Sequence, residues 1–164
     1  MTAKFVNPAV WIITVLIGLS TVGAALSQER SKAQPTADSG TMKLEVQLLW
    51  GTNDDQSPDK NHQPVDPDVR KRLKELPLKW SNYFLVTRKN FEVHAGEIKK
   101  EPLSEKCAIE VKNLGNGSIE VTQYGKTGQQ LWKGTQALPK GQVLFLGGNA
   151  PNATSWLVLL KRIE

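Results

Sequence analysis

Residues 107–124 read CAIEVKNLGNGSIEVTQY, two runs of alternating apolar and polar residues separated by the insert LGNG. An alternation with a period of two is typical of a β-strand that buries one face. Glycine and asparagine in the insert adopt the positive φ angles that a tight hairpin requires. This stretch therefore predicts two antiparallel strands joined by a hairpin.

The same alternation recurs on both sides of the hairpin, always bounded by turn-forming residues. Gly and Pro punctuate the chain at 124–128 and 138–141, which are typical turn sequences. Further strands are predicted at 42–50, 80–87, 91–95, 130–135, 142–146 and 155–163. Together with the hairpin they predict an antiparallel arrangement of about 7–8 strands.

One short helix is expected near 67–76. Asp66 suits the N-cap, and Pro67 suits the first helical position, where its missing N–H is not needed. Val69, Leu73 and Leu76 then share one apolar face. The predicted fold class is mainly β: an antiparallel β-sandwich or barrel-like sheet with one short helix, preceded by an N-terminal hydrophobic helix.

The first 27 residues are expected to direct the chain out of the cytoplasm. Lys4 precedes the uncharged stretch 9–26, which is the order of a secretory signal peptide. Its 18 residues also reach the lower limit of roughly 17 for a helix that spans a bilayer. Residues 1–27 are therefore interpreted as a signal peptide or a single-pass signal anchor, and either places the protein in the periplasm or on the outer face of the cytoplasmic membrane.

The rest of the chain divides into a linker and a domain. Residues 28–41 are polar and lack large apolar side chains, which predicts a flexible linker before a mainly-β domain at 42–164. The net charge of +5 over 164 residues is mild and does not indicate a nucleic-acid-binding protein. Cys107 is the only cysteine, and its apolar neighbours favour a packed thiol in a strand.

No residue is predicted to be catalytic, cofactor-binding or metal-binding. The sequence has no Gly-rich phosphate loop and no nucleophile elbow, so no small-molecule cofactor is expected. The acidic loop 53–59 lacks the Gly and Glu that an EF-hand needs at its sixth and twelfth positions. We therefore interpret that loop as a solvated turn.

The predicted contact with a partner is the basic face of the helix, at Arg70, Lys71 and Lys74. Cations clustered on one exposed helix face attract an anionic surface. The expected partner is an envelope protein or an anionic envelope component, with membrane contact through 9–26 if that segment is not cleaved. The predicted function is a non-catalytic interaction or assembly domain of the cell envelope.

Two alternatives remain open at the level of sequence. A carbohydrate-binding module would stack sugar rings on exposed tryptophans, and the candidates are Trp50, Trp80, Trp132 and Trp156. A small hydrolase would use one of the two histidines together with a nearby carboxylate. The candidates for that reading are His62, His94, Asp54, Asp55 and Asp59.

The order of motifs resembles that of uncharacterised small exported bacterial β-domain proteins. A short helix is followed by WSNY at 80–83, then by VLFLGG at 143–148 and by an apolar last strand, WLVLL at 156–160. In that group a "GG" turn precedes the last strand. The resemblance implies a location in the envelope and a β-rich fold, and it supplies no catalytic residue.

Overall fold

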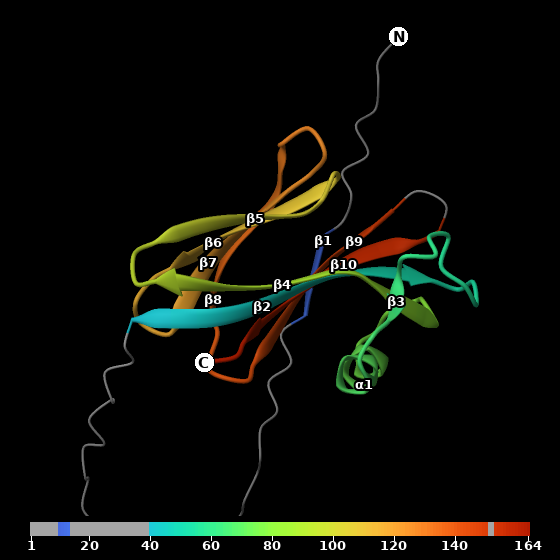
Figure 1. Cartoon of the computed structure of the whole chain (residues 1–164), viewed down its shortest axis with the longest axis horizontal. Helices are drawn as coiled ribbons and strands as arrows, with labels where there is room; N and C mark the ends of the chain where they lie inside the picture. The colour runs from blue at the N-terminus through green and yellow to red at the C-terminus, as the bar shows by residue number, and fades with distance from the viewer. Residues whose placement is uncertain (1–9, 14–39, 151–152) are drawn as a thin grey trace, which may run out of the picture.

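The computed structural model describes residues 10–13, 40–150 and 153–164, and these form two antiparallel sheets and one helix (Figure 1). The mainly-β prediction is confirmed, and the described residues hold ten strands, of which β1 and β3 are short. The elements are β1 (Val10–Ile13), β2 (Thr41–Thr52), β3 (Gln63–Pro64), α1 (Pro67–Glu75), β4 (Asn82–His94), β5 (Ile98–Ser104), β6 (Cys107–Asn113), β7 (Ser118–Tyr124), β8 (Gln130–Ala137), β9 (Val143–Asn149) and β10 (Ser155–Arg162).

The two sheets differ in how the chain builds them. The four-stranded sheet is a simple meander in the order β5-β6-β7-β8, and its central hairpin is the one predicted from residues 107–124. The six-stranded sheet has the order β1-β9-β10-β2-β4-β3. The C-terminal strand β10 therefore pairs with β2 on one side and with β9 on the other.

The six-stranded sheet is buried on its inner face and on part of its outer face. Its inner face packs against the four-stranded sheet, and α1 covers part of the outer face, on the opposite side (Figure 1). The outer face is exposed at Lys43, Arg88, Asn90 and Glu92. The inner core includes Leu44, Val46, Val93, Ile109, Val121, Leu146 and Val158. The outer core includes Leu49, Leu73, Leu85, Phe145, Leu157 and Leu159. Burial of both faces explains why 46–49 is a continuous buried run instead of a half-buried alternation.

A β-bulge in β4 allows odd-numbered side chains of this one strand to pack in both cores. The pairing of β2 with β4 shifts between Leu48 and Leu49, so that Val86 has no partner on β2. Tyr83 and Leu85 face the outer core, whereas Phe91, an odd-numbered residue like them, faces the inner core. An extra residue in one strand reverses which side chains face each way beyond it.

The predicted helix is confirmed as Pro67–Glu75, with Val69 and Leu73 buried. Pro67 occupies its first turn as expected. The role given to Asp66 is wrong in one respect, because its side chain makes no capping hydrogen bond. The carboxylate instead forms an ion pair with Arg88 of β4, which ties the start of the helix to the sheet.

Three strand predictions need correction. The strands expected at 80–87 and 91–95 are one long strand, β4, because β2 continues beside it over the whole length. Strand β5 was not predicted, since it contains Pro102 and is rich in charged residues, which an edge strand tolerates. Gly147 and Gly148 do not form a turn but lie within β9, opposite Leu157 and Trp156 of β10.

The N-terminal predictions fall mainly on residues outside the described ranges. Of the predicted targeting segment, the structure describes only Val10–Ile13, which forms β1 and pairs antiparallel with β9. Of the predicted linker, it describes only Gly40 and Thr41, and β2 begins at Thr41. Among the residues that it describes, no helix has the length and apolar character needed to cross a membrane.

Candidate functional site

The three candidate contact residues lie on the solvent side of α1. Arg70, Lys71 and Lys74 are exposed, because Val69 and Leu73 turn the opposite side of the helix toward the sheet. At 100° per residue, the three cations occupy about 100° of the helix circumference. None of them forms an ion pair within the described part of the chain.

The four candidate tryptophans are all half-buried and lie at different places. Trp80 packs against the outer core and donates a hydrogen bond from Nε1 to the carbonyl oxygen of Ala153, at 2.8 Å. Trp132 packs against the inner core from β8. The four rings therefore do not share one surface. Trp50 and Trp156 are brought together, because they face each other in the pairing of β2 with β10.

Trp50 and Trp156 form part of the wall of a pocket of about 710 Å³ between the two sheets. The six-stranded sheet contributes these rings together with Leu48 and the bulge residue Val86, and the four-stranded sheet contributes Leu131. Most of this wall is apolar. A pocket of such size and lining is typical of a small-molecule site.

A few polar side chains also reach this pocket. Gln123 of β7 is fully buried, and its Oε1 atom has no hydrogen-bond partner in the described structure. The Nε1 atom of Trp50 is likewise buried and unpartnered there. Cys107 lies beside Gln123, whose Nε2 is 3.8 Å from the sulfur, and burial raises the pKa of this thiol.

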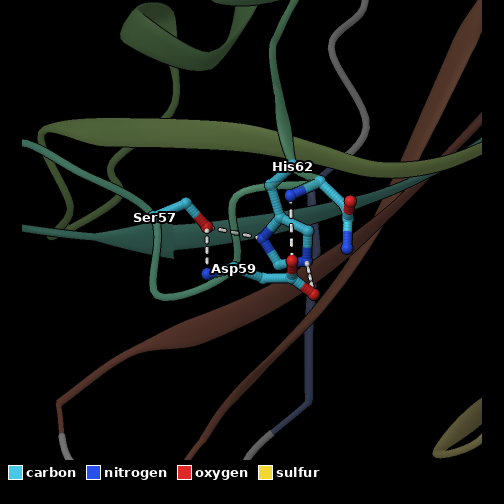
Figure 2. A network of polar contacts seen from close by, with 4 residues as sticks. Ser57, Asp59 and His62 are labelled. Carbon is cyan, nitrogen blue, oxygen red and sulfur yellow. Dashed lines mark hydrogen bonds and ion pairs between the residues drawn. The ribbon is translucent and has the colours of Figure 1, made fainter.

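His62 lies at the edge of the pocket and belongs to a polar network in the loop between β2 and β3 (Figure 2). Its Nδ1 atom is 2.6 Å from Ser57 Oγ, and its Nε2 atom is 3.9 Å from Asp59 Oδ2. A serine, a histidine and an aspartate are thus in contact, but the arrangement differs from a nucleophilic triad, in which Nε2 faces the serine and Nδ1 is hydrogen-bonded to the aspartate. His62 and Asp59 were among the residues predicted for a hydrolase, whereas Ser57 was not.

The same three residues also hold the loop in its turn. Asp59 Oδ1 accepts a hydrogen bond from the backbone N–H of Asn61, and the Asp59 carbonyl accepts one from the N–H of His62. Ser57 Oγ accepts a weaker one from the N–H of Asp59, at 3.4 Å. Ser57 is not among the residues around the pocket, so the group that would attack a substrate is not beside the cavity. The arrangement fits a loop that positions the His62 ring at the pocket rim.

The other candidate polar residues are separated from this network. His94 lies at the far end of β4, where its Nδ1 is 2.8 Å from Thr41 Oγ1. The Asp54 carboxylate accepts a hydrogen bond from the hydroxyl of Thr52, and Asp55 is exposed. Across the described ranges, no three His, Cys, Asp or Glu side chains converge in a way that would hold a metal ion.

One buried pocket residue had a signal in the sequence that was not used. Gln123 follows Ile119 and Val121 at the same alternation, and therefore points to the inner side of the sheet. A polar side chain at an inward position of a strand indicates an internal hydrogen-bonding role. In contrast, the place of Val86 in the pocket follows from the bulge and has no local signal.

Comparison of the chain with models of protein families, with curated proteins and with solved structures finds no match.

Proposed function

We propose that this protein is a non-catalytic interaction domain of the bacterial cell envelope, which contacts an anionic partner through Arg70, Lys71 and Lys74. The observation that carries the proposal is this stripe of exposed cations, which has no ion-pair partner within the described residues. Negative charges on an approaching partner would be attracted to these cations, and no existing ion pair would have to break.

The way in which α1 is attached to the sheet supports a role in binding. Its apolar side is fixed to the sheet by Val69 and Leu73, and its start is fixed by the ion pair between Asp66 and Arg88. The three cations are therefore displayed on a rigid element, which lowers the entropy lost when a partner binds. The expected export signal at 1–27 would present this surface outside the cytoplasm.

The test is capture of partners from a solubilised envelope fraction by the full chain. The charge-reversal variant Arg70→Glu/Lys71→Glu/Lys74→Glu is compared with wild type. A matched control reverses three exposed lysines outside α1 that form no ion pair within the described residues, Lys60, Lys106 and Lys126. The captured component is identified and its affinity for each variant is then measured with purified material at low salt.

We expect the helix variant to bind about a hundredfold more weakly, since each cation at an anionic surface contributes ~1 kcal/mol. The control variant is expected to stay close to wild type. Equal losses in the two variants would show that only net charge matters, and no captured component at all would refute the proposed function.

A further inference from the structure

We propose that the pocket between the two sheets binds a small apolar molecule that carries one neutral hydroxyl group. This site is independent of the helix surface, because α1 covers the opposite face of the six-stranded sheet. Its volume of about 710 Å³ lies within the range of ligand sites, which is about 300–1,000 Å³.

The wall of the pocket selects for an apolar body. Trp50 and Trp156 lie side by side on the six-stranded sheet, and Leu48, Val86 and Leu131 add aliphatic surface. A sugar presents a hydroxyl group on almost every carbon atom and would leave many of them unpaired here. Because each unpaired polar group costs about 1–3 kcal/mol, the lining disfavours a carbohydrate.

Two unpartnered atoms define the polar part of the ligand. Gln123 Oε1 is an acceptor in a side chain that is 0% exposed, and Trp50 Nε1 carries a donor hydrogen. Both side chains line the pocket, from facing sheets. A hydroxyl group is a donor and an acceptor at once, and its donor hydrogen is assigned to Gln123 Oε1, whereas its oxygen can accept from Trp50 Nε1.

The charge of the site disfavours an ionised ligand. The charged residues around the pocket, Glu105 and Lys106, are both exposed in the turn between β5 and β6 and have opposite signs. His62 also lines the pocket, but its two ring nitrogens already contact Ser57 Oγ and Asp59 Oδ2. Around the pocket there is therefore no buried cation without a partner to compensate a carboxylate, whose transfer to an apolar site is costly. A neutral alcohol avoids this cost.

The experiment uses the full chain in amphipol, labelled with ¹⁵N at tryptophan, and follows the indole N–H signals by NMR. The signal of Trp50 is assigned with Trp50→Phe, and the signal of Trp80, on the outer core, reports correct folding. The chain is titrated with n-decanol, n-decane and decanoate at pH 8. Two variants are compared with wild type: Gln123→Leu, which removes the acceptor, and Val86→Phe, which fills the pocket.

We expect n-decanol to shift the Trp50 signal to saturation and to bind more than tenfold more tightly than decanoate. Gln123→Leu should weaken the binding of n-decanol about three- to tenfold, which corresponds to the loss of one hydrogen bond, and should leave the binding of n-decane unchanged. Val86→Phe should abolish the binding of both molecules. The proposal is overturned if n-decanol gives no saturable shift at Trp50, if decanoate binds as well as the alcohol, or if Gln123→Leu weakens the alcohol and the alkane equally.

Discussion

Gly148 of β9 is a position at which one added methyl group is expected to destabilise the fold. It lies opposite Trp156 of β10, whose ring covers it on the inner side of the sheet. A Cβ atom at Gly148 would lie 2.5 Å from Cζ2 and 3.0 Å from Cε2 of that ring. Carbon atoms normally approach to about 3.5–4.0 Å, so the rigid ring must retreat by about 1 Å.

The cost of Gly148→Ala combines this clash with a gain in strand propensity. Overpacking of a core costs about 1–3 kcal/mol, and replacing glycine by alanine in a strand returns about 0.5–1 kcal/mol. The free energy of unfolding should therefore fall by about 1–2 kcal/mol. Because the ring is also part of the pocket wall, the same substitution should weaken binding of apolar ligands.

The assay is urea unfolding followed by circular dichroism, with an unchanged slope as evidence that the midpoint reports stability. Gly147→Ala is the matched control. Its Cβ would meet Cδ2 of Leu157 at 2.4 Å, but this atom ends a flexible side chain that can rotate away. In a Trp156→Leu background the cost of Gly148→Ala should disappear. The reasoning is refuted if the two alanine variants are equally stable, or if the cost persists after Trp156 is replaced.

Three further predictions concern single side chains. Leu73→Ala should lower the free energy of unfolding by about 2–5 kcal/mol, since Leu73 is buried on the side of α1 that faces the sheet. The variant of its exposed neighbour, Lys74→Ala, should change this free energy by less than about 0.5 kcal/mol in the same urea assay. Burial raises the pKa of Tyr83 from 10.0 to about 12. The Tyr83 hydroxyl therefore keeps its proton in the folded state at pH values where it has lost it in the unfolded state. The contribution of this group to the free energy of unfolding is complete below pH 10 and is lost as the pH rises toward 12. Unfolding curves across this range should show the loss in wild type and a smaller one in Tyr83→Phe. Burial also raises the pKa of Cys107, so alkylation by iodoacetamide at pH 8 should be slow in the folded chain and fast in urea; equal rates would contradict a packed thiol.

The elements whose signals lie within a short stretch of the chain were predictable from the sequence. The hairpin of β6 and β7 follows from two alternating runs and a Gly-Asn-Gly insert, and α1 follows from Pro67 and the spacing of its apolar residues. The fold class follows from the number of such runs. In each case the signal lies within about ten residues, which is the range over which periodicity and turn chemistry act.

The location of the strands relative to the two cores was decided by tertiary structure. Tyr83, Leu85 and Phe91 have the same parity in β4, yet the bulge at Val86 sends them to different faces. Nothing in the local sequence marks the bulge, because it exists only through the register with β2. Residues 98–104 likewise form the strand β5 because they pair with β6, although they include a proline.

The candidate sites divide in the same way. The cations of α1 were recognisable from their spacing, because helix geometry alone places Arg70, Lys71 and Lys74 on the side away from the apolar residues. The pocket joins Trp50, Trp156 and Gln123 from three strands that are distant in the chain. The alternation of residues places each of these side chains on one face of a strand. Only the packing of one sheet against the other brings them around a common cavity, because contacts between sheets are set by strand order and register.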